Sequence, residues 1–330
     1  MIITRTPYRI SLFGGGTDYP VWFENFGGGS VLSMTIDKYC YLTCRYWPPF
    51  FGKKTRVVWS KIEAVDHERE IEHPAVREAL KAANLENGLE IIHYGDLPHK
   101  TGMGSSSSFA VGLLHALSAI QGRSIDKREL ALGAIDLEQK KIGESVGCQD
   151  QIAAAYGGFN RINFGGQQKF TVYPISISPE MKDKLQSRLM LFYTGISRTA
   201  SEIAKEQIRV TAEKEKELRK MLSLVDDAEK ILCNSPENLD DLGVLLHETW
   251  TLKRGLTNLV SNDHIDEIYN RARKAGALGG KLLGAGGGGF MLFYVKPEDQ
   301  KRVKEALAGI LNIPFAFEDE GSKVIYSDGS

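Results

Sequence analysis

Residues 98–122 read PHKTGMGSSSSFAVGLLHALSAIQG, and they are the most informative part of this chain. Two glycines, Gly102 and Gly104, precede four consecutive serines, and apolar residues then continue almost without interruption to Ile120. A glycine stands just past that point, where helices commonly end. The pattern therefore predicts a glycine-rich loop that leads into a buried helix over residues 105–120.

The start of such a helix is suited to binding an anion. Its first N–H groups have no partner within the helix and lie at the positive end of the helix dipole. A phosphate group fits there without any basic side chain. Serine is also strongly favoured as a helix N-cap, so a purely structural cap explains this segment about equally well when it is taken alone.

Glycine is concentrated in two further segments, FGGGTD at 13–18 and GAGGGG at 284–289. Glycine allows a backbone to approach its neighbours closely. The second segment contains the G-x-G-x-x-G pattern of dinucleotide-binding proteins, but residues 290–295 (FMLFYV) predict a strand where that pattern requires a helix. Residues 276–282 are one residue too short for a Walker A loop and lack its Ser or Thr. A tight turn packed against other backbone remains the structural alternative for 284–289.

Two acidic residues stand out by their positions. Glu138 falls on the apolar stripe of a predicted helix over residues 127–142, so its carboxylate needs a buried partner. A divalent cation and a buried arginine are the two candidates for that partner. Asp150 lies just before Gln151 and an apolar run, where it could act as a helix N-cap or, functionally, as a general base.

The composition indicates a folded protein of two domains. The chain has 330 residues, of which 42% are hydrophobic and 25% are charged. Residues 31–46 and 89–95 predict strands, whereas residues 199–260 are mostly helical, so we expect a domain boundary near residue 180. A formal net charge of −1 provides no field to attract nucleic acid or an anionic membrane, so neither partner is expected.

The cysteines and the N-terminus bear on the cellular compartment. Four cysteines are too few for a disulfide framework, which fits a reducing environment. Residues 1–13 lack the apolar core of a signal peptide, and no window approaches 18 uninterrupted apolar residues. We expect a cytoplasmic protein, and the pattern indicates no particular oligomeric state.

Taken together, these segments resemble the GHMP kinase superfamily, named for galactokinase, homoserine kinase, mevalonate kinase and phosphomevalonate kinase. RISLFGGGTDY at 9–19 is similar to the galactokinase signature, with Gly15 and Gly16 in place of Glu-His. Residues 98–106 are similar to P-x-x-x-G-L-G-S-S, and 284–289 to the C-terminal glycine loop. The resemblance implies an α+β fold of two domains, a strand-rich βαβ-type domain at 1–180 and a ferredoxin-like α+β domain at 181–330.

The resemblance also implies an ATP- and Mg²⁺-dependent kinase and assigns roles to its residues. The ATP phosphates would be bound by the loop residues Gly102, Gly104, Ser105, Ser106, Ser107 and Ser108, and Mg²⁺ by Ser106 and Glu138. Asp150 would accept the proton of the attacking hydroxyl, while Arg9 keeps Asp150 ionised and screens the transferring phosphoryl group. The acceptor would be contacted by Gly15, Gly16, Thr17, Asp18, Gly286 and Gly287.

Within the superfamily, residues 13–20, 28–32, 36–39 and 192–198 resemble the D-glycero-D-manno-heptose 7-phosphate kinases. This implies phosphorylation of the anomeric hydroxyl of a heptose phosphate. An anomeric kinase for a free sugar such as fucose and a non-catalytic sugar sensor are the alternatives, and an NAD-dependent oxidoreductase is disfavoured by the strand after residue 289. A substrate phosphate calls for Arg or Lys donors, and the candidates are Arg5, Lys53, Lys54 and Arg198.

Overall fold

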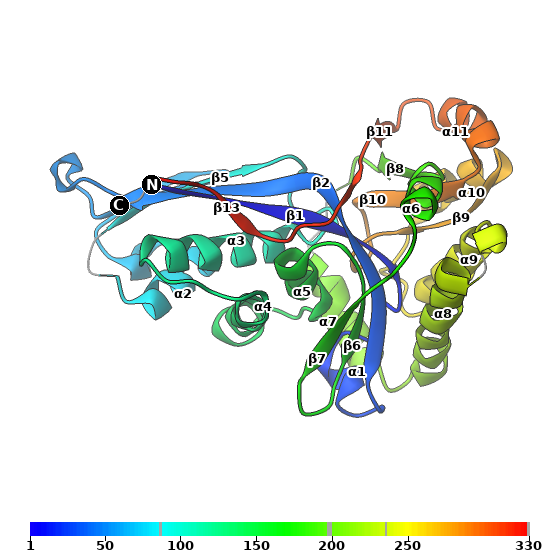
Figure 1. The fold of residues 1–330 in the computed structure, drawn as a ribbon, viewed down its shortest axis with the longest axis horizontal. Coiled ribbons are helices and arrows are strands. Elements are labelled where there is room, and N and C mark those ends of the chain that lie inside the picture. The colour runs from blue at the N-terminus through cyan, green and yellow to red at the C-terminus, as the bar shows by residue number, and fades with distance from the viewer. Residues whose placement is uncertain (86–87, 197–199, 235, 329–330) are drawn as a thin grey trace.

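The computed structural model describes the chain apart from residues 86–87, 197–199, 235 and 329–330. Its strands form a nine-stranded sheet and a four-stranded sheet. Figure 1 shows helices α2 to α5 together on one side of the larger sheet, and the smaller sheet with helices α8 to α11 at the opposite end of the molecule. None of the helices in these described residues is long and apolar enough to cross a membrane.

The strands are assigned to the two sheets as follows. The larger sheet contains β1 (Ile2–Phe13), β2 (Gly29–Tyr46), β3 (Thr55–Val58), β4 (Ile62–Val65), β5 (Leu89–Gly95), β6 (Phe159–Phe164), β7 (Phe170–Pro174), β12 (Phe317–Glu318) and β13 (Lys323–Ser327). The smaller sheet contains β8 (Leu189–Tyr193), β9 (Ala277–Leu282), β10 (Phe290–Val295) and β11 (Leu311–Ile313). The order in the smaller sheet is β11-β8-β10-β9, with antiparallel neighbours.

The helices are distributed along the whole chain. Up to residue 186 they are α1 (Pro20–Phe23), α2 (Pro74–Ala83), α3 (Ser105–Ile120), α4 (Lys127–Asp136), a π-helical turn (Leu137–Ile142), α5 (Gln149–Tyr156) and α6 (Pro179–Gln186). They are followed by α7 (Ala200–Val210), α8 (Glu215–Asn234), α9 (Asp241–Arg254), α10 (Asp263–Lys274) and α11 (Gln300–Ala306). Short 3₁₀ turns connect several of these elements.

Helix α3 is buried because it is apolar on nearly all sides, and it packs on strands β1 and β2. Val111 and Leu113 are both fully buried. The helix can lie so close to β1 because residue 112 is a glycine, where a Cβ atom would be only 2.8 Å from Thr6 Oγ1. This packing holds the N-terminus of α3 at a fixed position beside the strand that carries the first glycine segment.

Several helices and strands predicted from the sequence are confirmed by the structure. The predicted helix over 105–120 is α3, and the predicted strand over 290–295 is β10. The predicted helix over 127–142 is instead α4 followed by the π-helical turn, which ends at the left-handed Gly143 (φ 78°). The domain boundary at residue 180 stays a prediction, with one qualification: β12 and β13 return to the larger sheet, outside the expected second domain.

Candidate active site

The second and third glycine segments pack backbone against backbone. A Cβ atom at Gly102 would lie 2.4 Å from the Leu283 carbonyl oxygen, and one at Gly289 would lie 2.1 Å from the Thr101 carbonyl oxygen. Both glycines also have positive φ, +77° and +105°. Only glycine fits such positions, so the close backbone approach predicted for these segments is confirmed.

The first glycine segment is tied to the other two through strand β1. The Arg9 N–H donates to the Met103 carbonyl oxygen over 3.1 Å, which links β1 to the second segment. Thr17 is fully buried, and its hydroxyl donates to the carbonyls of Gly14 and Ser30 at 2.8 and 3.0 Å. We expected Thr17 to contact the acceptor, whereas its buried hydroxyl is hydrogen-bonded to the backbone of the loop.

Asp150 and Arg9 form a bidentate ion pair. Arg9 Nε lies 2.7 Å from Asp150 Oδ1 and Nη2 lies 2.6 Å from Oδ2, while Nη1 donates to the Gly102 carbonyl oxygen at 2.6 Å. The Arg9 side chain is 4% exposed and that of Asp150 is 24% exposed, so the carboxylate keeps one open side. The N-cap alternative for Asp150 is wrong, because Cys148 holds that position and Asp150 lies within the first turn of α5.

Asp18 lies next to this pair and is itself buried. Its Oδ1 accepts a hydrogen bond from the Gly16 N–H at 2.9 Å. Burial, and to a smaller extent the negative charge of Asp150, raises the pKa of Asp18. A Cβ atom at Gly147 would lie 1.8 Å from Asp18 Oδ2, so the loop before α5 packs directly on this carboxylate. The structure thus brings Asp18 and Asp150 to the same place.

Two side chains beside the first glycine segment have unpaired buried oxygens. Ser11 Oγ and Gln149 Oε1 have no hydrogen-bond partner among the described residues. A Cβ atom at Gly15 would lie 3.7 Å from Ser11 Oγ and 4.0 Å from Gln149 Nε2, so both side chains border this loop. Buried polar groups are normally paired, so these two oxygens are free to bond with a polar ligand or with water. Sequence reasoning singled out neither residue: Ser11 lies within the motif at 9–19 but was given no role, and Gln149 lies outside the three glycine segments.

Glu138 is buried among hydroxyl and amide donors. Its Oε1 accepts from Ser106 Oγ at 2.8 Å, and its Oε2 accepts from Ser107 Oγ at 2.7 Å and from Gln151 Nε2 at 2.5 Å. Burial raises the pKa of Glu138 to about 7, although the three hydrogen bonds oppose this shift. The partners of Glu138 among the described residues are two serines and a glutamine, so of the two alternatives the structure does not support the buried arginine.

The oxygens of Glu138 and Ser106 have the chemistry that Mg²⁺ prefers. Magnesium takes oxygen ligands and usually keeps only one or two from the protein, with water and phosphate completing the shell. Within the described residues no group of three or more His, Cys, Asp and Glu side chains could hold a metal ion. The pair of Glu138 and Ser106 thus suits a cation that arrives with a phosphate ligand.

The N-terminus of α3 is left without a side-chain cap. Its N-cap position is Gly104, with φ 74°, so the structural-cap alternative for the serines is wrong. Ser106 and Ser107 point to Glu138, and Ser108 Oγ donates to the Pro7 carbonyl oxygen at 2.8 Å. The uncapped N–H groups at this helix end can therefore receive an anion.

The third glycine segment is held by contacts with two residues outside the sequence motifs, Val260 and Gln207. The Gly287 N–H donates to the Val260 carbonyl oxygen at 2.9 Å, and a Cβ atom at Gly286 would lie 2.8 Å from Val260 Cα. Gln207, on α7, donates to the Ala285 carbonyl oxygen at 2.8 Å and accepts from the Tyr19 hydroxyl at 3.3 Å. Gln207 thus connects the third segment to the first.

Two buried lysines also reach these segments. Lys253 Nζ, from α9, donates to the carbonyl oxygens of Leu282 (2.9 Å) and Gly284. Lys281 Nζ, from β9, donates to the Leu12 carbonyl oxygen at 2.9 Å. Nothing in the sequence pattern distinguishes Lys253 from the many surface lysines of the helical region.

The candidates for a substrate phosphate fall elsewhere in the structure. Arg5 forms ion pairs with Glu318 and Glu320 on the larger sheet, and Lys53 pairs with Asp66 in an exposed position. Arg198 lies outside the described residues, and Lys54 is exposed in the same loop as Lys53. By contrast, Lys214, which sequence reasoning missed, lines a narrow crevice together with Gly16 and Tyr19.

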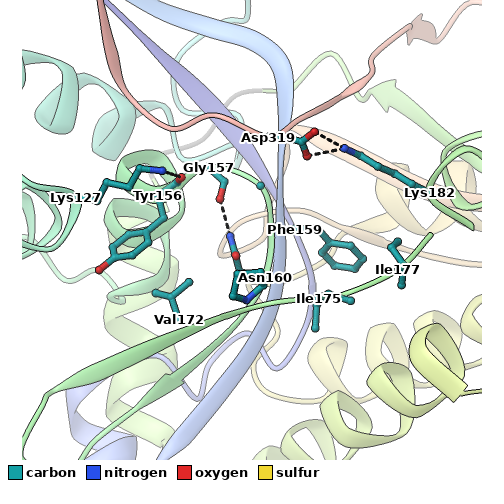
Figure 2. Close-up of a pocket in the computed structure, with 12 residues that line it drawn as sticks. Lys127, Tyr156, Gly157, Phe159, Asn160, Val172, Ile175, Ile177, Lys182 and Asp319 are labelled. Atoms are coloured by element: carbon teal, nitrogen blue, oxygen red, sulfur yellow. Dashed lines mark hydrogen bonds and ion pairs between the residues drawn. The ribbon is translucent and has the colours of Figure 1, made fainter. Parts of the chain in front are cut away.

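A separate cavity lies away from these residues. It has a volume of about 470 Å³ and is lined by Lys127, Tyr156, Gly157, Gly158, Phe159, Asn160, Val172, Pro174, Ile175, Ile177, Lys182 and Asp319. Figure 2 shows that Lys182 and Asp319 pair at its edge, with contacts of 2.5 and 2.7 Å. It adjoins the C-terminal end of α5, whereas Asp150 lies at the N-terminal end.

Comparison with known proteins agrees with this arrangement. Residues 71–158 match the family described as GHMP kinases N terminal domain, and residues 208–311 match GHMP kinases C terminal. The chain is 30% identical to the D-glycero-alpha-D-manno-heptose 7-phosphate kinase of Campylobacter jejuni, over 98% of each chain. It is 28% identical to the bifunctional fucokinase/GDP-fucose pyrophosphorylase of Arabidopsis thaliana, over 91% of this chain and 30% of that protein.

Solved structures show the same fold over the full length. A D-glycero-D-manno-heptose 1-phosphate kinase from Bacteroides thetaiotaomicron superposes with a TM-score of 0.80 at 25% identity, over 99% of this chain and 100% of that one. The expected two-domain α+β architecture is therefore confirmed.

Proposed function

The chain belongs to the GHMP kinase family of phosphotransferases, and on this premise we propose that it transfers the γ-phosphate of ATP to the anomeric hydroxyl of D-glycero-D-manno-heptose 7-phosphate. The observation that carries this proposal is the bidentate pair of Arg9 and Asp150, which is fixed to the Gly102 carbonyl of the phosphate-binding loop. It sets a carboxylate of fixed orientation beside the helix end that can receive the nucleotide.

Asp150 acts as the general base in this proposal. The anomeric oxygen attacks the γ-phosphorus, the bond from that phosphorus to the bridging oxygen of ADP breaks, and the hydroxyl proton passes to Asp150. The Arg9 guanidinium orients the Asp150 carboxylate through two hydrogen bonds and opposes the negative charge that develops on the transferring group. The open side of Asp150, 24% exposed, gives the hydroxyl access to the carboxylate.

The triphosphate binds at the N-terminus of α3, where Gly104 leaves the helix uncapped. Ser106 and Glu138 would hold Mg²⁺, which neutralises charge on the phosphate oxygens when bound. The serine hydroxyl and the carboxylate already lie 2.8 Å apart. Gln151 and Ser107 hold the second oxygen of Glu138 in place.

The acceptor sugar lies along the first glycine segment, next to Asp18. The unpaired oxygens of Ser11 and Gln149 would then be satisfied by sugar hydroxyls, which are donors as well as acceptors. Lys214, at the crevice beside Gly16, is 30% exposed, and its carboxylate neighbour Glu217 is 3.5 Å away. We assign the remote phosphate of the sugar to this ammonium group.

A second candidate reaction is phosphorylation of an unphosphorylated sugar such as fucose, and the similarity to a fucokinase-containing protein favours it. The two are separated by an ADP-release assay against the heptose 7-phosphate, the free heptose and fucose, followed by identification of the product. The heptose 7-phosphate should have the highest kcat/KM. Turnover of fucose alone would overturn the first proposal, and an absence of ATP consumption with every sugar would overturn both.

A further inference from the structure

Lys253 and Lys281 are among the most deeply buried charged groups of the chain. Their side chains are only 7% and 2% exposed. Their Nζ atoms donate to backbone carbonyl oxygens, and no carboxylate of the described residues lies within ion-pair distance of either. Two ammonium groups thus occupy the interior with only neutral acceptors, an arrangement that strongly destabilises the charged form.

These lysines surround the reaction site without touching it. Lys281 binds the carbonyl of Leu12, just before the first glycine segment, and Lys253 binds the carbonyl of Gly284, at the start of the third. Arg9, on β1, faces both lysines as a like charge, and Asp18 is the nearest opposing charge. The positions of both ammonium groups are therefore fixed by the same backbone segments that form the site.

The positive and negative side chains around the reaction site do not balance. Three cationic side chains, Arg9, Lys253 and Lys281, stand against two carboxylates, Asp18 and Asp150, and both oxygens of Asp150 already accept hydrogen bonds from Arg9. Burial, and then the charge of Arg9, lowers the pKa of Lys253 to about 7. Burial and the charge of Lys253 lower the pKa of Lys281 well below its usual range. Burial therefore disfavours the charged form of both lysines in the free protein.

A bound triphosphate changes this balance. It introduces several negative charges at the α3 N-terminus, next to Gly102, which packs against Gly284. An anion near a buried amine favours its protonated form, and interactions between charges are strong in a site from which water is excluded.

We propose that Lys253 and Lys281 are positioning residues whose buried charges are matched to the phosphoryl groups of the bound nucleotide, and that Lys253 takes up a proton from solvent when the nucleotide binds. This inference rests on the proposed kinase function. As a neutral amine, Lys253 still donates two N–H groups to the carbonyls of Leu282 and Gly284, so the loop is held before and after protonation.

The test is isothermal titration calorimetry with the Mg²⁺ complex of a non-hydrolysable ATP analogue, at pH 8. Repeating the titration in buffers of different ionisation enthalpy gives the number of protons taken up. The native protein should take up more protons than Lys253→Met. Lys301→Met, an exposed site on α11, is the matched control and should equal the native protein. Equal proton uptake in Lys253→Met and in the native protein would overturn the inference.

A second variant keeps the test informative if Lys253→Met does not fold. Arginine stays protonated throughout this pH range, so Lys253→Arg should bind the analogue while losing the proton uptake. Uptake that persists in Lys253→Arg would assign the proton to another group and also overturn the inference.

Stability and turnover distinguish a functional charge from a structural one. Lys253→Met should keep or raise the Tm, because it removes a buried amine that has no carboxylate partner among the described residues, and it should lower kcat at least 10-fold. A lower Tm with unchanged kcat would reduce Lys253 to a structural role. Binding of the analogue does not involve the sugar, so these results stand if the heptose assignment fails. If the native protein does not bind the analogue, the kinase proposal itself fails and this inference with it.

Discussion

Arg9 Nη2 and Asp150 Oδ2 lie 2.6 Å apart, and a second contact of 2.7 Å, between Nε and Oδ1, makes the pair bidentate. A fork of this kind fixes the plane of the carboxylate as well as its distance. The third contact of Arg9, to the Gly102 carbonyl, ties that plane to the glycine-rich loop before α3. The proposed base and the proposed phosphate site therefore share one rigid connection.

Asp150→Asn should lower kcat by about 10²-fold or more and leave nucleotide affinity nearly unchanged, because the amide cannot accept the hydroxyl proton. Steady-state kinetics and a nucleotide binding assay measure the two effects. Asp183→Asn, at an exposed position of α6, is the control and should behave as the native protein. Unchanged turnover in Asp150→Asn would remove this residue from the mechanism.

Ser106→Ala and Glu138→Gln should each raise the Mg²⁺ concentration required for half-maximal activity, because each removes an oxygen ligand from a cation with few protein contacts. Activity is measured over a Mg²⁺ titration at saturating ATP. Ser108→Ala serves as the comparison, since its hydroxyl binds the Pro7 carbonyl and does not reach Glu138. Native-like Mg²⁺ curves for both variants would refute the assignment.

Glu138 should also make stability depend on pH. Its pKa is raised from 4.5 to about 7 in the folded protein, so folding opposes its ionisation. Below pH 4.5 the group is protonated in both states and has no effect, and its destabilising effect grows as the pH rises to about 7, reaching about 3 kcal/mol.

Glu138→Gln removes this ionisable group, so the free energy of unfolding of the variant relative to the native protein should be higher at pH 7.5 than at pH 5. Urea unfolding at both pH values, without Mg²⁺, measures it. An equal difference at the two pH values would show that the folded state does not raise this pKa.

The sequence predicted the elements better than it predicted their contacts. The helix over 105–120 and the strand over 290–295 are confirmed because each has a simple apolar pattern between glycines. The pairing of Glu138 with Ser106 and Ser107 could not be derived from periodicity, which shows only that the carboxylate is buried. Nothing in the sequence indicated that Lys253 is buried. Its burial results from the packing of α9 on β9, and these two elements are separated in the chain by α10.

The close approach of the second and third glycine segments leads to another prediction. Gly102→Ala should reduce both stability, by more than about 2 kcal/mol, and nucleotide affinity, because its Cβ would overlap the Leu283 carbonyl oxygen at 2.4 Å. Gly122 has a similar positive φ, +68°, but a Cβ atom added there would have no other atom within 4 Å. Gly122→Ala should therefore show only the smaller loss due to backbone strain, about 1 kcal/mol.

Chemical denaturation of the two variants separates the packing effect from the strain effect. A stability loss in Gly102→Ala no larger than that in Gly122→Ala would mean that the second and third glycine segments can move apart at little cost. Their contact would then not fix the geometry of the site.

The last prediction concerns the remote phosphate of the acceptor. If a heptose 7-phosphate is the substrate, its phosphate should supply binding energy that aligns the anomeric oxygen with the γ-phosphorus, so the free heptose should have a much lower kcat/KM. A charge-assisted contact contributes about 1.5–3 kcal/mol, which corresponds to roughly 10- to 100-fold.

Lys214→Ala should therefore lower kcat/KM for the heptose 7-phosphate by about 10- to 100-fold and leave that for the free heptose nearly unchanged. Lys216→Ala, an exposed site two residues further along, is the matched control. It should show the same ratio of kcat/KM values for the two sugars as the native protein. Equal loss on both sugars would mean that Lys214 supports the fold of the crevice and does not bind the phosphate. Equal efficiency of the native protein on the two sugars would instead favour a free-sugar kinase, because a phosphate that contributes no binding energy cannot position the anomeric oxygen.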